Sequence, residues 1–303
     1  MRYTSLGIIV DDIVFPDGRT AMGVLGGGGM YTVAGMRVWS EDVGLLASVA
    51  HDFDDAMLAG LALHYDGLRR GPRPTARAWQ LCEDDGQRTQ IPRIPEADWA
   101  PQLSWPDNLP ELACELGVRA IHLLSRGLPG NAETIAQLAA GGVRVSVEPV
   151  IEEGMDATQV ERVLASLPHV EIFSPGLPEL RVLMGDTPAQ RALPELAERG
   201  PALVALRMGA AGSLAYERAS GRFLRVPAAP ARVVDVTGAG NAYAGGMLVG
   251  WCEGGSLEHA AACAAVSAAL VIEQIGPPTI TPALLEDARR RRDALLAELR
   301  WSE

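Results

Sequence analysis

The sequence predicts an α/β fold in which a doubly wound, mostly parallel sheet is flanked by helices and carries a small β-sheet lid. Three observations support this prediction. Apolar runs rich in β-branched residues alternate regularly with helical patterns from Glu111 onward. An Asp-Gly pair within residues 75–93 indicates an antiparallel hairpin that interrupts the alternation. Near the C-terminus, a strand-like run meets a helical one at a glycine-rich turn, residues 233–246.

The composition is typical of a globular protein with one large core. The chain has 303 residues, of which 48% are hydrophobic and 21% charged, and we expect a single domain over residues 1–303. The net charge of −12 argues against nucleic acid as a partner, because a duplex-binding surface needs a basic patch. The four cysteines lack CxxC spacing and are expected to be free thiols. The N-terminal residues lack a long apolar run, which predicts a cytoplasmic protein without signal peptide or membrane contact.

The first part of the chain is predicted to contain two strands and two helices. Residues 3–14 read as a buried strand that ends at the pair Asp11–Asp12. Four glycines then precede a helix-compatible run, Met30–Trp39, and ordering them costs backbone entropy. A site where a ligand approaches the backbone therefore explains these glycines better than a linker does. The next elements are expected to be a strand and an amphipathic helix, at Val43–Ala50 and Asp54–Leu68.

The hairpin over residues 75–93 is expected to turn at Asp85-Gly86 and to form the lid sheet. The segment 14–25 is expected to contribute to the same sheet. Residues 94–110 are rich in proline and tryptophan and are expected to be irregular.

The second part of the chain repeats the strand–helix pattern. Helices are expected at 111–117, 131–140, 156–167, 178–184 and 188–198, and strands at 120–124, 143–149, 170–174 and 202–206. A hairpin over 213–235 precedes the glycine turn, and helices over 256–275 and 283–300 follow it, the arginine run 289–292 being interpreted as a solvated face. Ligands bind at the carboxyl ends of parallel strands. We therefore expect Asp12, Glu148, Glu179 and the turn 237–241 to share one cleft.

The glycine turn, VVDVTGAGNAYAGG, is predicted to be an anion site. Glycines allow the backbone to approach a ligand, and the helix that follows directs unpaired N–H groups and the positive end of its dipole at the turn. Phosphate is the anion most often bound in this way. Asn241 directly follows the glycines and is expected to lie beside the anion.

The same turn carries a family resemblance. DVTGAGNAYAGG, from Asp235 to Gly246, closely resembles the C-terminal signature DTxGAGDxFxxG of the PfkB/ribokinase family of carbohydrate and nucleoside kinases. The resemblance spans nearly the whole chain and includes LRMGAAGS at 206–213 and VIEQIGPP at 271–278. GGGGMYTVAGMR, the pair Glu148-Pro149, GAGN and IEQIG look most like the branch that contains the fungal killer-maintenance proteins, which carries Asn after GAG.

The resemblance implies a ribokinase-like fold and a phosphotransferase that uses ATP and Mg²⁺. Gly238, Ala239 and Gly240 would form the anion hole for the transferred phosphoryl group. Asp235 and Thr237 would support this loop, in some members near a monovalent cation.

The resemblance also places the nucleotide and the metal. Gly209 and Gly212 would approach the nucleotide, with Arg207 close to it. Glu179 and Asp235 would lie at the metal and the nucleotide phosphates.

The acceptor substrate is implied to be a sugar, a nucleoside or a related polyol beneath the lid. Asp11 or Asp12 would hold its hydroxyls. The spacing from an upstream glycine favours Asp12 and the following isoleucine favours Asp11, so this choice stays open. Gly27, Gly28 and Met30 occupy further substrate positions, and the exposed edge of the lid sheet is implied as a homodimer contact.

Three residues depart from the family pattern. Asn241 replaces the aspartate that acts as catalytic base, and a neutral amide is a far weaker proton acceptor. Gly176 replaces the asparagine of an Asn-x-x-Glu motif that retains Glu179. Met30 replaces an asparagine that usually binds substrate, which is expected to put an apolar group in the pocket. A positioned general base typically contributes about 10²–10⁴-fold to the rate, but phosphoryl transfer depends mainly on positioning and charge stabilisation.

Two functions therefore stay open. The first is an ATP-dependent kinase whose activity is weakened or independent of a base. The second is a catalytically silent relative that binds a nucleotide or small ligand in a regulatory or structural role. A Rossmann dehydrogenase fits poorly, because the best glycine motif lies near the C-terminus and lacks a ribose-binding acid. If the pocket is competent, Asn241→Asp is expected to raise phosphoryl transfer.

Overall fold

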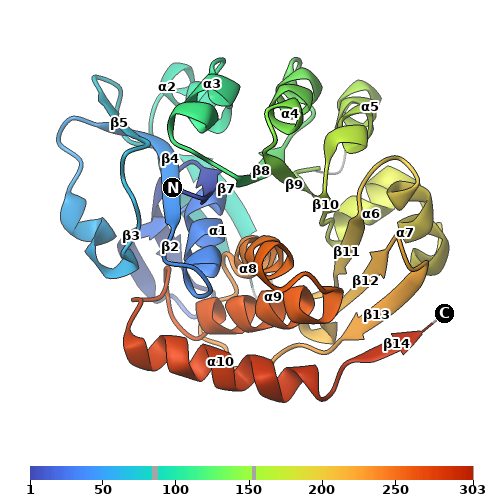
Figure 1. Ribbon diagram of the computed structural model, residues 1–303. Helices are drawn as coiled ribbons and strands as arrows, with labels where there is room; N and C mark the ends of the chain where they lie inside the picture. Colours follow the sequence, from blue (N-terminus) through green and yellow to red (C-terminus); the bar gives the residue numbers. More distant parts are fainter. Residues whose placement is uncertain (84–87, 152–154, 303) are drawn as a thin grey trace.

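The computed structural model describes residues 1–83, 88–151 and 155–302. Within these ranges the strands form two sheets (Figure 1). The larger sheet has ten strands in the order β14-β13-β12-β11-β10-β9-β8-β1-β4-β5. These strands are, in chain order, β1 (Tyr3–Leu6), β4 (Val43–Ala50), β5 (Leu68–Gly71), β8 (Ala120–Ser125), β9 (Arg144–Pro149), β10 (Ile172–Phe173), β11 (Leu203–Arg207), β12 (Ser213–Glu217), β13 (Arg222–Val226) and β14 (Arg300–Ser302).

The larger sheet is mostly parallel, which confirms the prediction from the sequence. Every neighbouring pair from β5 to β11 is parallel, and β12, β13 and β14 extend the sheet in antiparallel fashion. The chain adds β4 on one side of β1 and β8 to β11 on the other, so the strand order reverses between β1 and β8. In a doubly wound sheet, ligands bind at such a switch point, outside the carboxyl ends of the strands.

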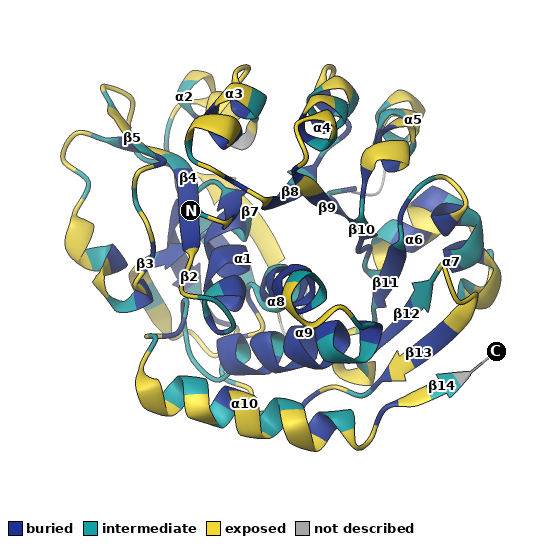
Figure 2. Cartoon of the chain, viewed as in Figure 1, coloured by how far each residue is buried: buried dark blue, intermediate teal, exposed yellow. Residues whose placement is uncertain are grey.

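Helices cover both faces of this sheet (Figure 1). One face carries α1 (Gly28–Arg37), α8 (Ala239–Gly254), α9 (Leu257–Ile272) and α10 (Pro282–Leu296), and the other carries α3 (Leu109–Glu115), α4 (Asn131–Ala140), α5 (Ala157–Ser166), α6 (Leu177–Met184) and α7 (Ala189–Ala197). Successive residues of β11 enter opposite cores: Leu203 packs in the core of α8 and α9, and Val204 packs in the core of α4 and α7. This alternation follows from the period of two along a strand. Figure 2 shows β11, α8 and α9 as largely buried.

The smaller sheet has four strands in the order β3-β2-β6-β7, namely β2 (Ile9–Val14), β3 (Thr20–Gly26), β6 (Arg77–Cys82) and β7 (Arg88–Pro92). The expected antiparallel hairpin is formed by β6 and β7, and the segment 14–25 contributes β3. The predicted turn at 85–86 lies outside the described residues.

The single strand expected over residues 3–14 is wrong. β1 ends at Leu6 in the larger sheet, and β2 begins at Ile9 in the smaller one. Gly7 lies between them with a φ of 94°, a conformation that glycine adopts readily and that turns the chain from one sheet to the other.

The amphipathic helix expected over Asp54–Leu68 is also wrong. A 3₁₀ helix, η1, covers Asp55–Leu61 and ends where Ala62 takes a left-handed conformation with a φ of 50°. Leu68–Gly71 then pairs with β4 as the edge strand β5.

Two further segments differ from their predictions. Residues 94–110 contain α2 (Glu96–Leu103) and the start of α3, because Trp99 is buried against Ile9 and Ala78 of the smaller sheet and holds α2 there. The last helix ends at Leu296, and β14 follows it as an edge strand that pairs with β13. Two short 3₁₀ helices complete the fold, η2 (Leu167–His169) and η3 (Gly209–Ala211).

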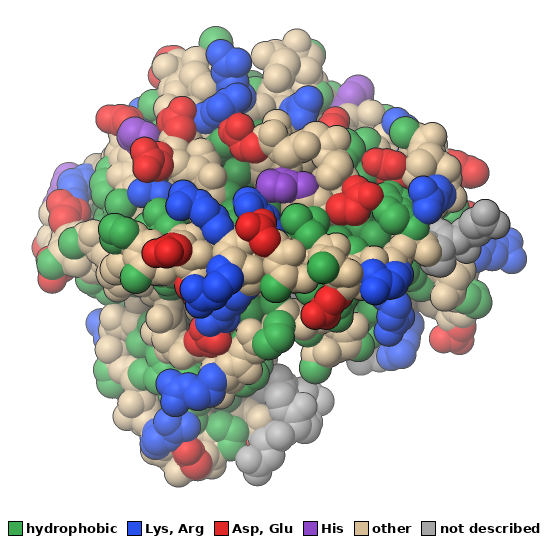
Figure 3. All heavy atoms as spheres, turned by 60° about the horizontal axis from the view of Figure 1, so that its bottom comes forward, with side chains coloured by type: hydrophobic (Ala, Val, Ile, Leu, Met, Phe, Trp, Pro, Cys, Tyr) green, Lys and Arg blue, Asp and Glu red, His purple; other side chains and the backbone are tan. Residues whose placement is uncertain are grey.

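The surface around α10 carries charges of both signs, as expected for a solvated face. Arg291 pairs with Glu273 at 3.0 Å, and Arg292 pairs with Asp293 at 2.7 Å. Figure 3, which brings this side of the molecule forward, shows arginine side chains interspersed with acidic ones. All four cysteines are free thiols, and no helix in the described ranges is both long and apolar enough to span a membrane.

Candidate functional site

A cavity of about 460 Å³ lies at the switch point, where residues of both sheets meet. This volume falls in the range of about 300–1,000 Å³ that is usual for small-molecule sites. The lining comes from the ends of β1 and β8, the smaller sheet, the glycine run and the start of α8, and includes Leu6, Gly7, Ile8, Asp11, Gly27, Gly28, Tyr31, Leu46, Gln80, Arg88, Trp105, Leu124, Arg126, Glu148, Thr237, Gly238 and Asn241.

The glycine turn forms the N-terminus of α8 on one wall of this cavity. Gly238 is the N-cap residue and has a φ of 79°, and a Cβ at this position would overlap the ring of Tyr31. Only glycine meets both conditions. Thr237, Gly238 and Asn241 line the cavity, whereas Ala239 and Gly240 belong to the first turn of α8 without lining it.

Asp235 supports this turn from below. Its Oδ1 accepts hydrogen bonds from the backbone N–H and the hydroxyl of Thr237, at 2.9 and 2.7 Å. Its Oδ2 is buried and has no hydrogen-bond partner in the described ranges of the chain. A buried, unpartnered carboxylate oxygen is costly unless a further group satisfies it.

Asn241 binds a carboxylate at the carboxyl end of β9. The Nδ2 of Asn241 donates to Oε2 of Glu148 at 3.0 Å, and Nη1 of Arg207 donates to Oε1 of the same residue at 2.8 Å. Glu148 lies at the carboxyl end of β9 and is buried. Burial alone would raise its pKa, but Arg207 and His122 outweigh this effect and lower the pKa to about 2. Glu148 is therefore an ionised carboxylate at neutral pH.

His122 completes this cluster. It is fully buried on β8, with Nδ1 at 2.9 Å from the hydroxyl of Ser146 and Nε2 at 3.6 Å from Oε2 of Glu148. Asn241, Glu148, Arg207 and His122 thus come from four different elements, α8, β9, β11 and β8.

Asp11 and Asp12 have different surroundings. Asp11 lines the cavity, and its Oδ1 accepts a hydrogen bond from Nε2 of Gln80 at 2.7 Å. Burial raises the pKa of Asp11 to about 6. Asp12 lies outside the lining and is fully buried, with hydrogen bonds from the N–H of Gly23 at 2.8 Å and from Arg77 and Arg93.

Met30 does not place an apolar group in the cavity, which corrects the expectation from the sequence. It is fully buried in the core that α1 forms with α8 and α9, and it is not among the residues that line the cavity. Gly27 and Gly28 of the same segment do line the cavity. A Cβ on Gly28 would press on Leu124 and lie 3.2 Å from Nδ2 of Asn241.

Of the residues expected at the nucleotide, Thr237 lines the cavity, whereas Arg207, Gly209 and Gly212 do not. Gly209 begins the 3₁₀ turn after β11, and Gly212 ends it. Arg207 approaches Gly240 so closely that a Cβ there would overlap its guanidinium. Arg207 therefore connects the glycine turn with the end of β11.

Glu179 lies in the first turn of α6, and its buried Oε2 finds no hydrogen-bond partner within residues 1–83, 88–151 and 155–302. A Cβ on Gly176 would overlap this oxygen, so the glycine leaves room for the carboxylate to fold back over the helix N-terminus. The expected cleft is thus divided: Glu148 and the turn 237–241 share the cavity, whereas Asp12 and Glu179 lie outside it. In the described part of the chain, no three His, Cys, Asp or Glu side chains gather in a way that could hold a metal ion.

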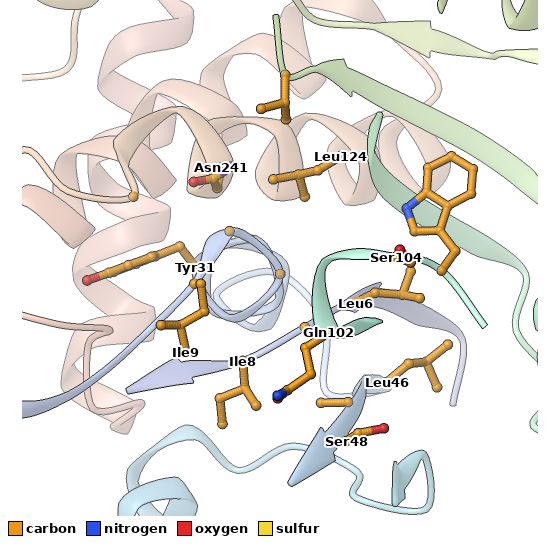
Figure 4. A pocket seen from close by; sticks show the side chains of 18 of the residues that line it. Leu6, Ile8, Ile9, Tyr31, Leu46, Ser48, Gln102, Ser104, Leu124 and Asn241 are labelled. Atoms are coloured by element: carbon orange, nitrogen blue, oxygen red, sulfur yellow. The ribbon is translucent and has the colours of Figure 1, made fainter. Parts of the chain in front are cut away.

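Both apolar and polar side chains line the cavity. Figure 4 shows Leu6 and Leu46 on the side of the cavity away from Tyr31, near Ser48, Gln102 and Ser104. Trp105, Pro106 and Leu112 also line the cavity. The cavity therefore offers apolar surface beside the polar groups of Asp11 and Asn241.

A model of the pfkB family of carbohydrate kinases matches residues 26–284. This range covers most of the chain and includes the glycine run and the glycine turn. The chain belongs to the pfkB family.

Two relatives of this pfkB-family chain are named as kinases. A cytidine kinase from Thermococcus kodakarensis is 25% identical over 277 residues, which cover 90% of this chain and 96% of the relative. A ribokinase from Arabidopsis thaliana is 29% identical over 226 residues, which cover 72% of this chain and 57% of the relative.

Solved structures share the ribokinase fold with the pfkB-family chain. An Escherichia coli protein provisionally assigned as a ribokinase II has a TM-score of 0.79 at 20% identity, with 96% of this chain and 99% of that chain covered. The structure of that protein with ATP and Mg²⁺ has a TM-score of 0.75. Arabidopsis thaliana ribokinase with ribose and ATP has a TM-score of 0.71 at 21% identity, covering 96% of this chain and 98% of that chain.

Three lining or supporting residues of this pfkB-family site escape the sequence patterns. Tyr31 and Gln80 line the cavity, and the hydroxyl of Tyr31 and Oε1 of Gln80 are buried with no hydrogen-bond partner among the described residues. His122 supports Glu148. Tyr31 directly follows the glycine run and Met30, a position that favours contact with a ligand. Gln80 and His122 interrupt apolar stretches as single polar residues, a signal shared by many core positions.

Proposed function

We propose that the protein is an ATP-dependent kinase that phosphorylates a hydroxyl of a sugar, a nucleoside or a related polyol. The observation that carries this proposal is the single cavity that brings the carboxylate of Asp11 and the N-terminus of α8 around the same space. Membership of the pfkB family supports it.

The start of α8 is proposed to bind the transferred phosphoryl group. Within the described residues, the backbone N–H groups of Gly238 and Gly240 have no hydrogen-bond partner, whereas that of Ala239 donates to the carbonyl of Val236 at 3.3 Å. The 16-residue helix adds the positive end of its dipole. Asn241 would lie beside the attacking hydroxyl. Asp11 and the backbone of Gly27 and Gly28, which line the same cavity, would hold the acceptor hydroxyls.

Arg207, Gly209, Gly212 and Thr237 are proposed to contact the nucleotide. Glu179 fits a place near Mg²⁺, because its buried Oε2 lacks a partner and Mg²⁺ is usually held by one or two carboxylates together with substrate phosphates. Bound Mg²⁺ would neutralise charge on the phosphate oxygens. The unpartnered Oδ2 of Asp235 fits a monovalent cation on the same grounds.

A nucleoside is the acceptor we propose to test first. Apolar side chains of the lining, such as Trp105 and Leu124, can cover a flat, weakly polar group such as a base, whereas a simple sugar presents hydroxyls on most sides. The similarity to a cytidine kinase along 90% of the chain makes cytidine the first choice. Further parts of the proposal are a place in the branch of the killer-maintenance proteins, action in the cytoplasm, and a homodimer through the smaller sheet, whose strand β7 is exposed along its length.

A catalytically silent relative is the second candidate. Asn241 favours it, because its amide donates to Glu148 and cannot take a proton as an aspartate does. Such a protein would still bind a nucleotide or small ligand, in a regulatory or structural role.

Calorimetry and a phosphorylation assay separate these candidates. We expect ATP with Mg²⁺ to bind, and ADP to form when cytidine, other nucleosides, ribose or fructose is added. ATP binding without ADP formation across this panel supports the silent relative. The absence of ATP binding at millimolar concentration argues against both candidates. Asp186→Asn, at an exposed position after α6, serves as a control that should leave binding and activity unchanged.

A further inference from the structure

The carboxylate that the pfkB signature carries after its glycines has a counterpart at another position of this chain. Residue 241 is an asparagine, but Oε2 of Glu148 lies 3.0 Å from its Nδ2, and Glu148 lines the same cavity. A carboxylate is therefore present at the site. It belongs to the residue that Asn241 hydrogen-bonds, and it comes from β9 instead of α8.

We propose that Glu148 accepts the proton of the attacking hydroxyl and that Asn241 positions it. This inference rests on the proposed kinase function and names the group that replaces the missing aspartate.

The hydrogen bonds around Glu148 leave it able to take this proton. An ionised carboxylate oxygen accepts only, so Asn241 must present its NH₂ to Oε2 and its Oδ1 is directed elsewhere. Each carboxylate oxygen has two lone pairs. One lone pair of Oε2 accepts the hydrogen bond from Asn241, and Oε1 accepts the hydrogen bond from Arg207. The second lone pair of Oε2 is free for a hydroxyl in the cavity, apart from His122 at 3.6 Å.

The low basicity of Glu148 is compatible with this role. Phosphoryl transfer passes through a loose transition state that needs little activation of the attacking oxygen. The hydroxyl becomes strongly acidic only once its oxygen bonds to phosphorus. Glu148 must therefore be ionised and correctly positioned, but it does not need to be a strong base.

In the proposed step, one bond to the γ-phosphorus forms and another breaks. A lone pair of the hydroxyl oxygen forms a bond to the γ-phosphorus of ATP, and the bond from this phosphorus to the bridging oxygen breaks, leaving its electron pair on ADP. The hydroxyl proton moves to Oε2 of Glu148, which later releases it to water.

Four variants of the full chain test the proposal, with ATP, Mg²⁺ and the best acceptor of the panel. They are Glu148→Gln, Asn241→Asp, the double variant Glu148→Gln/Asn241→Asp, and Glu253→Gln. The last is the matched control, because Glu253 also binds an arginine, Arg2 at 3.1 Å, but lies outside the cavity lining.

We expect Glu148→Gln to lower kcat by about 10²-fold or more, while the KM for ATP changes little. The double variant returns a carboxylate to the site at position 241 and should recover most of the lost kcat. Asn241→Asp alone should gain less than this, because it sets two carboxylates about 3 Å apart and like charges at that distance oppose ionisation. Glu253→Gln should match the wild type.

A merely structural Glu148 gives a different pattern. It would lower the melting temperature or raise the KM, and Asn241→Asp would not restore kcat, since it does not rebuild the bond to Arg207. A Glu148→Gln variant that keeps its kcat, or a double variant no faster than Glu148→Gln, overturns the proposal. If Glu148→Gln does not fold, Glu148→Asp replaces it: this variant keeps a charge for Arg207 but withdraws the carboxylate by one methylene. Unchanged kcat in Glu148→Asp also overturns the proposal.

Failure of the inference and failure of the proposed function are distinguishable. If the wild type binds ATP but phosphorylates no acceptor, the kinase function fails and the inference with it. If the wild type is active and Glu148→Gln is equally active, only the inference fails.

Discussion

Asp11 and Asp12 are adjacent in the chain but face opposite sides of β2. Asp11 faces the cavity and Gln80, whereas Asp12 is turned toward Arg77 and Arg93. Neighbouring side chains of a strand point to opposite faces, so only one of the two can serve a ligand in this cavity. The other holds strands of the smaller sheet together.

Asp11→Asn and Asp12→Asn should therefore have different effects. Asp11→Asn should raise the KM for the acceptor by about 10–100-fold, the loss of a hydrogen bond to a charged group, with ATP binding unchanged. Asp12→Asn should lower the free energy of unfolding by roughly 1.5–3 kcal/mol through weaker bonds to its arginines. Steady-state kinetics and urea unfolding measure the two quantities. A larger effect of Asp12→Asn than of Asp11→Asn on the acceptor KM would contradict the assignment.

The raised pKa of Asp11 predicts a pH dependence of acceptor binding. Burial raises this pKa to about 6, and the nearby Asp12 and Asp235 add to the effect, while Gln80 and Arg88 oppose it. Below this pH Asp11 is a neutral acid and accepts hydrogen bonds from hydroxyls less strongly. We expect kcat/KM for the acceptor to fall by about tenfold per pH unit below pH 6. In Asp11→Asn, kcat/KM for the acceptor should not show this fall below pH 6. A wild-type kcat/KM that is constant between pH 5 and 7 would refute the prediction.

Gly238→Ala should abolish ATP binding. The new methyl group meets the ring of Tyr31, and the residue must also keep a φ of 79°. Gly255 at the other end of α8 is a matched control, with a φ of 65° and no atom within 4 Å of an added Cβ. Gly255→Ala should cost only the left-handed conformation, about 1–2 kcal/mol, and retain nucleotide binding. Calorimetry with ATP and thermal unfolding compare the two variants, and equal ATP affinities would count against the anion site.

Glu179→Gln should raise the Mg²⁺ concentration needed for half-maximal activity. Its buried Oε2 has no hydrogen-bond partner among the residues that the structure describes, so a cation in the ATP complex can use it. We expect a change of about 10–100-fold, the range found when groups around a metal are altered. Titration of activity with Mg²⁺ at fixed ATP checks this, with Glu198→Gln on the exposed end of α7 as the control. An unchanged Mg²⁺ requirement would place Glu179 outside the metal site.

Most of the fold could be predicted because periodic patterns report burial directly. The alternation of strands and helices after Glu111 follows from apolar spacing, and the larger sheet has the mostly parallel topology expected. The errors lie where distant contacts override local preference. Trp99 holds α2 against the smaller sheet in a segment whose prolines suggest a loop, and Gly7 divides an apparently continuous apolar run between two sheets.

Contacts between residues distant in the chain also affect the expectation that Asn241→Asp raises phosphoryl transfer. That expectation treats residue 241 by itself, because the carboxylate within the motif, Asp235, binds Thr237 and not Asn241. Glu148 is 93 positions away in the chain and 3.0 Å away in space. The single substitution therefore brings two carboxylates together, and its effect depends on a neighbour that the motif does not contain.

The sequence by itself determined the fold class, the family and the position of the glycine turn, because each depends on residues close together in the chain. Only the tertiary structure decided that Asp11 faces the cavity, that Met30 belongs to the core, and that Glu148 carries the charge beside Asn241. The placement of these side chains depends on which elements meet at the switch point between β1 and β8. Local patterns along the chain do not predict contacts between distant elements.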